Sequence, residues 1–427
     1  MKTPGVLWPL MSPPEEHGLA ELCAVSAKGV EVTFAGGRKL LCGTSGMWNT
    51  PLGYGNEAIA AAAGRALREA SYLSVWGGEN VYARQAAEAL VQLAGSSHFA
   101  RVLFSTSGGA ANDMAMKLAR QYQVVRGEKD RNIILGLHGG YHGLTYGAFA
   151  LTSGQLGQKM YGVDRRLVGH VHPNDVDELR SVMERIGDRV AAVVLEPVLG
   201  TGAIVLDEGY LAELFRQRTA HGFLLVADEV TTGFARVGPG MFASQAWAEP
   251  ADVLITAKGL TNGAQAASAL IVSDPIARAF TTSAAVLAHA ETQAGTPVVC
   301  AAILATIDEM ERLDVLTLGA TLSRWLDDRL PGMMTRAPLV TGTNGRGCLR
   351  AIQLSAPDGR SLDALEVAEV LAEIRRAGAL VSEGPSCIQV LPALVYSEDD
   401  LEELLEAITV GLSAYAEKHF VLAEDSF

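Results

Sequence analysis

The sequence predicts an α/β protein whose central sheet is mostly parallel and covered by helices. Short apolar segments alternate along the chain with longer helical patterns, which is the order of elements in such folds. Most of these segments show no period-two alternation, so we expect both of their faces to be buried, as in a parallel sheet. The expected strands are 101–106, 132–138, 190–198, 222–230, 252–259 and 267–273.

Helical patterns lie between the strands and dominate the last third of the chain. In 364–378 and 398–420, apolar residues recur at helical spacing on one side of the segment. The expected helices are 109–127, 206–222, 297–313, 364–378 and 398–420, with a half-exposed strand at 349–355 and a β-hairpin at 28–41. We expect a large domain over 45–304 and a smaller α+β domain built from 1–44 and 305–427.

The composition of the 427-residue chain excludes several classes of protein. Acidic residues outnumber basic ones, 48 to 34, and the net charge is −14. Such a surface repels a phosphate backbone, so we expect no nucleic-acid partner. No segment reaches the roughly 18–20 apolar residues of a membrane span, and the first residues carry prolines and acids in place of a secretory signal. Five scattered cysteines without a CxxC pair predict reduced thiols in a cytoplasmic protein.

A single lysine, Lys258, follows the apolar segment 253–257. It is compatible with a surface lysine at the start of a helix, because most lysines are exposed. It is also compatible with a lysine that forms a Schiff base, because a partly desolvated amine becomes nucleophilic toward an aldehyde. The residue alone does not decide between these interpretations.

Asp228 ends another apolar segment and is followed by Glu229. A carboxylate at the end of a buried parallel strand requires a cationic partner, and ligand sites of α/β sheets lie at these strand ends. The pyridinium nitrogen of pyridoxal phosphate is such a partner, because the carboxylate keeps that ring protonated and able to accept electrons. The alternatives are a cap on the next turn or a metal site shared with Glu229. No histidine cluster supports a metal, and we expect none.

Two glycine-rich turns follow strands and offer the remaining parts of such a site. In 105–120, small residues precede a helix whose first N–H groups would bind an anion, although a tight turn alone explains the glycines. In 139–145, Tyr141 offers a flat surface for a cofactor ring and His142 stands beside it, although both residues are compatible with core packing.

The motifs together resemble the class III, or ω-, aminotransferases of fold-type I, which depend on pyridoxal phosphate. The resemblance covers nearly the whole chain, and the pieces stand in family order. The matching segments are SGGAANDMAMKLAR, YHGLT, LEPVLGTG, ADEVTTGFARVG, AKGLTNG and HAETQAGTPVVCAA. Racemases, aminomutases and decarboxylases share the scaffold and the same motifs, and a member that binds the cofactor without turnover is a further alternative.

The resemblance implies a role for each matched residue. Lys258 would bind the cofactor as an imine and later move a proton at the substrate carbon, and Asp228 would pair with the ring nitrogen. Tyr141 and Val230 would lie on opposite faces of the ring. Gly108, Gly109 and Ala110 would cradle the phosphate, Thr292 would reach the phosphate of a neighbouring subunit, and His142 and Glu196 belong to the cofactor site. A homodimer with shared active sites is therefore expected.

The substrate side departs from the family pattern. Many relatives carry an arginine that binds a substrate carboxylate where this chain has Ser382 followed by Glu383. Without that clamp, we expect an acceptor aldehyde or ketone lacking a nearby carboxylate, such as a large or peptide-borne carbonyl of a biosynthetic pathway. Glu383 would then receive a cationic group. The alternatives are a shifted alignment in a variable loop, or a replacement clamp formed by Arg236, Arg346 or Arg350.

Three aromatic residues are candidates for the substrate pocket. Trp48 and Tyr54 lie in a segment that aligns with a pocket-lining segment of the family. Trp8 lies in a segment that resembles one folding over the active site. Packing in the core or at an interface is the alternative for both tryptophans, and we favour it for Trp8 but the pocket for Trp48.

Overall fold

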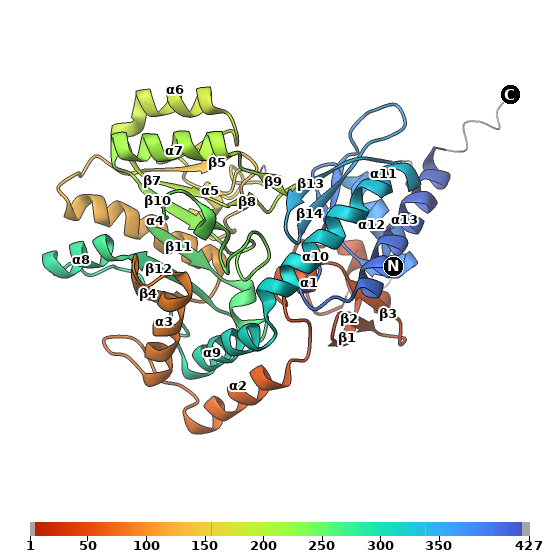
Figure 1. The fold of residues 1–427 in the computed structure, drawn as a ribbon, viewed down its shortest axis with the longest axis horizontal. Helices are drawn as coiled ribbons and strands as arrows, with labels where there is room; N and C mark the ends of the chain where they lie inside the picture. Colours follow the sequence, from red (N-terminus) through yellow and green to blue (C-terminus); the bar gives the residue numbers. More distant parts are fainter. Residues whose placement is uncertain (1–4, 155, 338, 421–427) are drawn as a thin grey trace.

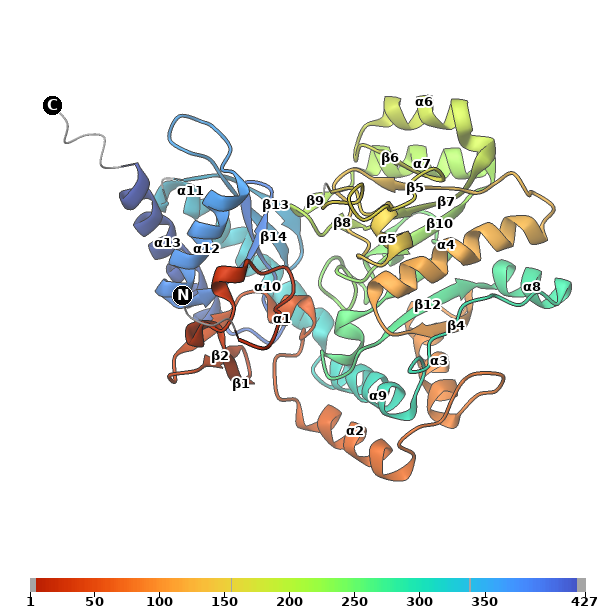
Figure 2. The ribbon, with the colours of Figure 1, turned by 180° about the vertical axis from the view of Figure 1, so that it is seen from behind.

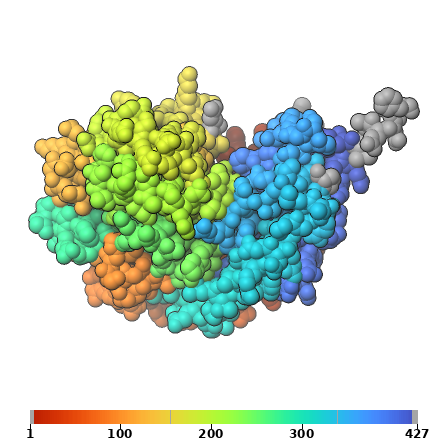
Figure 3. Space-filling view, turned by 45° about the horizontal axis from the view of Figure 1, so that its top comes forward, coloured from red at the N-terminus to blue at the C-terminus, as the bar shows by residue number. Residues whose placement is uncertain are grey.

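The computed structural model describes residues 5–154, 156–337 and 339–420. The chain forms a large lobe around a central sheet and a smaller lobe that contains the N-terminal strands together with the C-terminal helices (Figures 1 and 2). In the space-filling view, the blue C-terminal lobe meets the green and yellow residues of the large lobe along a continuous boundary (Figure 3).

The large lobe is built on a seven-stranded sheet with the order β4-β12-β11-β10-β7-β5-β6. From β11 to β6 all neighbouring strands are parallel, and only β12 runs antiparallel to its two neighbours. The expected mostly parallel sheet is therefore confirmed. The strands are β4 (Phe99–Ser105), β5 (Ile133–Leu137), β6 (Val168–Val171), β7 (Val190–Leu195), β10 (Leu224–Asp228), β11 (Val253–Thr256) and β12 (Ser268–Ser273).

Helices cover both faces of this sheet, as its apolar strands require. On one face α4 (Gly108–Val125) and α8 (Asp274–Ser283) share an apolar core with the strands. On the other face α6 (Val176–Ile186) and α7 (Glu208–His221) enclose a second core. Strands β7, β10 and β11 are buried at every residue, which explains why their sequences lack alternation.

The smaller lobe holds two further sheets. One contains β1 (Ala24–Lys28), β2 (Glu31–Phe34), β3 (Lys39–Cys42) and β15 (Ala379–Leu380), so the hairpin expected at 28–41 is present and a C-terminal strand extends it. The other has the order β13-β14-β17-β16. Its strands are β13 (Val340–Arg346), β14 (Leu349–Leu354), β16 (Ser382–Gly384) and β17 (Cys387–Val390), and α12 (Ala364–Ala377) packs against α13 (Glu398–His419) beside them.

The expectation for 349–355 was wrong in one respect. This segment is a strand, but β14 is buried at all but one residue instead of half-exposed. Its polar Arg350 is buried because the guanidinium donates to Asp327 at 2.6 Å and to the Gly347 carbonyl at 2.8 Å. A polar residue in a strand therefore did not mark a solvent face here.

Helices α9 (Pro297–Arg312) and α10 (Val315–Arg329) run from the large lobe to the smaller one (Figure 1). Because α9 passes residue 305 without a break, the division into 45–304 and two flanking segments stays a prediction. The remaining elements are α1 (Ser45–Trp48), α2 (Glu57–Glu69), α3 (Val81–Ala94), α5 (Tyr146–Leu151), α11 (Met333–Arg336), β8 (Val198–Leu199) and β9 (Ile204–Val205). None of the helices in the described ranges is long and apolar enough to cross a membrane.

Candidate active site

A cavity of about 580 Å³ opens at the carboxyl ends of the central strands. This is the edge of an α/β sheet where ligands bind, and the volume falls within the usual range of about 300–1,000 Å³ for small-molecule sites. Its walls come from the turns that follow β4, β5, β10 and β11. The sequence-predicted residues that line it are Gly108, Gly109, Tyr141, His142, Asp228, Val230 and Lys258.

Lys258 projects into the cavity directly after the buried strand β11. Its backbone has a φ of +47°, in the left-handed region that side-chain-bearing residues rarely adopt. The amine donates a hydrogen bond to Thr231 Oγ1 at 2.8 Å, and it lies 4.4 Å from the centre of the Trp48 ring. Such strain persists only where the surrounding structure fixes the residue. The backbone of Lys258 therefore helps to hold its amine between Thr231 and Trp48.

The amine of Lys258 is easier to deprotonate than an ordinary lysine. Burial lowers its pKa to about 8, while the carboxylates of Glu196 and Asp228 act in the opposite direction. A neutral amine is the nucleophilic form toward a carbonyl and is also the form that accepts a proton. At pH 7 about a tenth of the amine is therefore in the neutral form, against less than a thousandth for an ordinary lysine.

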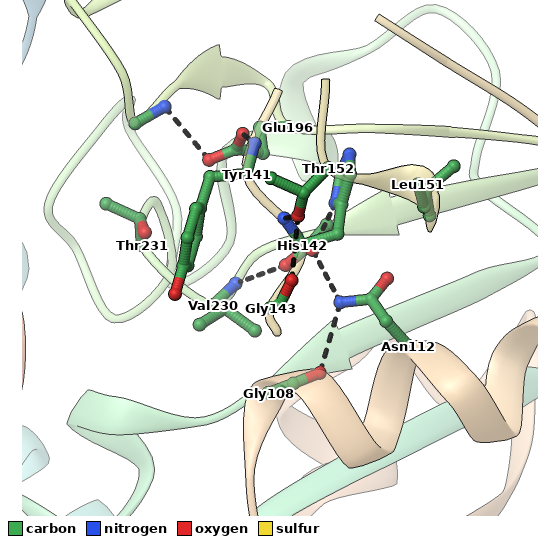
Figure 4. Close-up of polar contacts among 12 residues, drawn as sticks. Gly108, Asn112, Tyr141, His142, Gly143, Leu151, Thr152, Glu196, Val230 and Thr231 are labelled. Carbon is green, nitrogen blue, oxygen red and sulfur yellow. Dashed lines mark hydrogen bonds and ion pairs between the residues drawn. The ribbon is translucent and has the colours of Figure 1, made fainter. Parts of the chain in front are cut away.

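Asp228 ends β10, is 2% exposed, and has its carboxylate held by three contacts within the protein. His142 Nδ1 lies 2.7 Å from Oδ2, and Asn112 Nδ2 donates to the same oxygen at 2.8 Å (Figure 4). The Val230 N–H donates to Oδ1 at 3.1 Å. Asp228 therefore also caps the next turn, which was one of the alternatives considered for it. A carboxylate offers about four lone-pair sites, so Oδ1 retains capacity for a cationic partner in the cavity.

Glu229 turns away from Asp228 and does not share a ligand position with it. Its carboxylate accepts from Thr232 Oγ1 at 2.5 Å and from the Ser244 N–H at 2.6 Å. Glu229 is completely buried, and these two hydrogen bonds use both of its carboxylate oxygens. The pair of adjacent acids thus divides into one that faces the cavity and one that holds a loop.

Two further ionisable groups belong to this region, His142 in the cavity lining and Glu196 outside it. Burial would lower the pKa of His142, but the hydrogen bond and charge of Asp228 outweigh it and the pKa is raised. Burial raises the pKa of Glu196 to about 7. The Glu196 carboxylate accepts from the backbone N–H groups of Tyr141 at 3.0 Å and Gly200 at 2.9 Å, so it orients the turn that carries Tyr141 (Figure 4).

An anion cradle lies at the start of α4. The helix begins at Gly108, and the N–H groups of its first turn have no acceptor within the helix. A side chain on Gly143, whose φ is +117°, would overlap Gly109 Cα, so two backbone segments meet here without side chains. Ala110 is differently placed, because its N–H already donates to Ser107 Oγ at 3.2 Å and it does not line the cavity.

Between the cradle and Asp228 the residues of the cavity fit pyridoxal phosphate. Tyr141 and Val230 both line it, and Val230 lies against Gly108, where an added Cβ would come within 3.3 Å of it. The residues thus provide N–H groups for a phosphate, apolar surface for a ring, a carboxylate for its nitrogen and an amine for its aldehyde. When bound, this cofactor supplies an electron-accepting ring, and the chain's own groups bind and orient it.

Trp48 reaches Lys258 from α1, which is a left-handed turn. Ser45, Gly46, Met47 and Trp48 have φ values of +42°, +62°, +55° and +70°. Such a conformation costs about 1–2 kcal/mol per side-chain-bearing residue. The guanidinium of Arg236 stabilises the turn, because Nη2 donates to Ser45 Oγ at 2.6 Å and to the Trp48 carbonyl at 3.3 Å.

Other sequence-predicted residues lie outside the cavity lining. Trp8 is 80% exposed, with its ring 6.2 Å from that of His17. The Tyr54 hydroxyl lies 3.3 Å from Cys42 Sγ. Thr292 is exposed, and its carbonyl accepts from Tyr72 Oη at 3.0 Å.

Ser382 and Glu383 lie on the edge strand β16. Ser382 pairs with Gln389 of β17, whose amide donates to the Gly200 carbonyl beside Glu196. Side chains of directly opposed residues share a face and neighbours along a strand alternate. Ser382 therefore faces the loop next to the cavity, and Glu383, which is exposed, faces the other side.

Sequence reasoning missed several residues at the site. Asn112 binds Asp228 from the buried side of α4, and Thr231 binds the amine of Lys258. Glu291 accepts hydrogen bonds from the side chains of Ser105 and Thr106 at the edge of the cavity. Only Thr231 carried a local signal, since it follows the predicted ring-contacting residue Val230 by one position.

The fold and the cavity together define a pyridoxal-phosphate enzyme with the architecture of a transaminase. A model of the aminotransferase class-III family matches residues 11–412, and the chain belongs to this family. The predicted family, fold and cofactor are therefore confirmed.

Individual relatives agree with this assignment. The chain is 32% identical over 414 residues to an acetylornithine aminotransferase of Mycolicibacterium smegmatis, covering 94% of this chain and 96% of the relative. It is 30% identical over 410 residues to an omega-aminotransferase of Caulobacter vibrioides, covering 90% and 91%. Among solved structures, a PLP-bound amine transaminase from an uncultivated Pseudomonas species superposes with a TM-score of 0.91 at 28% identity, over 97% of this chain and 100% of that one.

Proposed function

We propose that this class III aminotransferase moves an amino group from an amine or amino-acid donor to an aldehyde or ketone that lacks a carboxylate beside the reacting carbon. A large or peptide-borne carbonyl of a biosynthetic pathway is the acceptor class that we favour. The observation that carries the proposal is the cavity wall, in which none of the described lining residues is an arginine. A bidentate arginine is the usual partner of a carboxylate held in fixed orientation.

Arg236 is committed elsewhere. It is 2% exposed and donates to Ser45 Oγ, to the Trp48 carbonyl and, from Nη1, to the Pro392 carbonyl at 3.0 Å. Burial lowers its pKa to about 10, and it is a cation at neutral pH. Binding a substrate carboxylate would require breaking the contacts that hold the α1 turn.

The other two arginines are also poor candidates for a clamp. Arg350 forms an ion pair with Asp327 at 2.6 Å. Arg346 lines a separate groove together with Trp247 and Phe215. Ser382 is the residue whose side chain faces the 196–200 loop, and a serine provides no charge for a carboxylate. A cationic substrate group at Glu383 is less favoured, because Glu383 faces away from that loop.

The proton transfers of the reaction are assigned to the chain's own groups. Lys258 is proposed to take the proton from the carbon that bears the substrate amine and to return one at the neighbouring carbon of the cofactor, because a tethered base reaches both atoms. Asp228, held by His142 and Asn112, is proposed to keep the ring nitrogen protonated. Glu196 is proposed to keep the Tyr141 turn in place against the ring.

The assembly and setting are part of the proposal. We favour a homodimer with shared sites, in which the exposed Thr292 reaches the phosphate of the second subunit. The exposed apolar residues of the N-terminal segment, Trp8 among them, would be covered in the same assembly. A cytoplasmic location remains the expectation from the reduced cysteines.

A donor and acceptor screen on the purified holoenzyme tests the proposal. Carboxylate-free aldehydes should exceed pyruvate and 2-oxoglutarate in kcat/KM by at least about tenfold, since a buried ion pair contributes more than about 1.4 kcal/mol where it exists. Dominance of a simple α-keto acid would refute the acceptor class. Racemisation, or decarboxylation without exchange of the amino group between two substrates, would refute transamination as the reaction.

A further inference from the structure

We propose that Thr231 and Trp48 are positioning residues that together hold the amine of Lys258 in the orientation from which it moves a proton. The inference rests on the proposed role of Lys258 as the base of this aminotransferase. For Trp48, this function goes beyond the role in the substrate pocket that the sequence led us to expect. Thr231 lies in the loop after β10 and Trp48 in the α1 turn, and both contact the amine.

Thr231 supplies a directed contact. The Lys258 amine donates one N–H to Thr231 Oγ1 at 2.8 Å, and Thr231 is buried. A neutral amine that uses an N–H in this bond keeps its lone pair free, at roughly a tetrahedral angle to the bond. The hydroxyl therefore restricts the lone pair to the two remaining tetrahedral positions on Nζ without consuming it.

Trp48 supplies a face. The amine lies 4.4 Å from the centre of the indole, within the range of about 6 Å in which a ring attracts an ammonium group. The indole Nε1 is buried with no hydrogen-bond partner among the described residues, so the ring is not held by that atom. Its placement depends instead on the backbone of the α1 turn.

Lys258 and Trp48 both have a strained backbone conformation, and such strain persists only where the surrounding structure maintains it. Lys258 and Trp48 have φ values of +47° and +70°. The buried Arg236 pins the turn that carries Trp48 and also binds the Pro392 carbonyl. One cation thereby ties the α1 turn, the loop after β10 and the C-terminal segment around the position of the indole.

The charged groups around the amine decide which variants can test this inference. Glu196, Asp228 and Arg236 are the charges that act on Lys258. Variants must leave these three residues intact, so that a change in the lysine reports the loss of the hydroxyl or the ring. Both contacts favour the ammonium form, and their loss should make the amine easier to deprotonate.

Competitive acetylation of the apoenzyme with acetic anhydride, read by mass spectrometry across pH 6–10, measures this directly. In the wild-type protein Lys258 should titrate near pH 8. Thr231→Val and Trp48→Leu should each lower the midpoint by about 0.4–1 pH unit, the equivalent of a contact worth about 0.5–1.4 kcal/mol. Thr231→Ser and Trp48→Phe, which retain the hydroxyl and the aromatic face, should stay within about 0.2 units of the wild type. The exposed Lys129 in the same digest is the internal control.

A second readout concerns the proton transfer itself. With the best donor from the screen, deuterated at the carbon that bears the amine, Thr231→Val and Trp48→Leu should show a larger isotope effect on kcat than the wild type. A misplaced base slows that step and makes it more rate-limiting. Thr231→Val is nearly isosteric, so it remains informative even where Trp48→Leu fails to fold.

The outcomes separate this inference from the proposed function. Unchanged titration midpoints and isotope effects in Thr231→Val and Trp48→Leu would overturn the positioning role. Shifts of equal size in the conservative variants would overturn it as well, since they would indicate a loss of packing alone. Full turnover in Lys258→Ala would instead overturn the role of the lysine on which the inference rests.

Discussion

Replacing Lys258 by methionine is expected to stabilise the apoenzyme, although the same change should abolish turnover. A pKa of about 8 in place of the ordinary 10.5 means that folding disfavours the ammonium form by about 3 kcal/mol. Because part of the side chain faces the open cavity, solvent screening reduces the expected gain to about 2–3 kcal/mol. Unfolding entropy for 427 residues is about 0.9 kcal/mol per kelvin, so the melting temperature should rise by about 2–3 °C at pH 7.

The sign of this effect fixes its pH dependence. Below pH 8 the amine carries its proton in both the folded and the unfolded chain, so the wild type bears the full penalty. Between pH 8 and 10.5 the folded chain gives up the proton first, and the penalty fades. The gap in melting temperature between Lys258→Met and the wild type should therefore be largest at pH 7 and shrink toward pH 10.

Differential scanning calorimetry of cofactor-stripped proteins at pH 7, 8.5 and 9.5 measures this gap. Lys129→Met is the matched control, because Lys129 is exposed and its loss should change little. A Lys258→Met protein that is less stable than the wild type at pH 7 would refute the reasoning. A gap that does not change between pH 7 and 9.5 would show that packing, and not the buried charge, is responsible.

The remaining predictions concern the cofactor and the acceptor. Asp228→Asn keeps the shape of the carboxylate but not its charge, and kcat/KM should fall by about 10²–10⁴-fold; a loss below threefold would contradict the role given to the charge. Gly143→Ala, which would overlap the phosphate cradle, should reduce the fraction of cofactor retained on gel filtration, measured by absorbance. Gly127→Ala, also at positive φ but in open space, is its control, and equal retention by both would count against the cradle. Ser382→Arg should raise kcat/KM for pyruvate by at least about tenfold, whereas Glu383→Arg, on the opposite face of β16, should not; equal behaviour of the two would contradict the assigned face.

Much of the fold was predictable because apolar periodicity reports burial. The strands 222–230 and 252–259 read as continuous apolar runs, and β10 and β11 are buried at every residue. The direction of a strand is harder to predict than its burial, because an apolar segment buried on both faces has the same pattern in a parallel and an antiparallel strand. The antiparallel course of β12 and the short strand β6 were therefore not apparent from the sequence.

Some residues of the site could also be predicted from the sequence, and others could not. Lys258, Asp228 and the glycines of α4 were predictable as a group, because the carboxyl ends of parallel strands share one edge of the sheet. Asn112 was not, since its side chain reaches Asp228 across a contact between distant segments. The destination of Arg236 also depends on tertiary structure, because its partners come from the N-terminal and C-terminal parts of the chain.

The pairing of β3 with β15 joins two segments that lie far apart in the sequence. The parallel ladder matches Leu41 with Ala379 and Cys42 with Leu380, so this sheet lacks its fourth strand until the ribosome has synthesised Leu380. During synthesis β3 presents an unpaired edge, and an unpaired edge recruits other chains. A transcript that ends before codon 379 would leave this edge open permanently, and its product would be a substrate for chaperones and proteases.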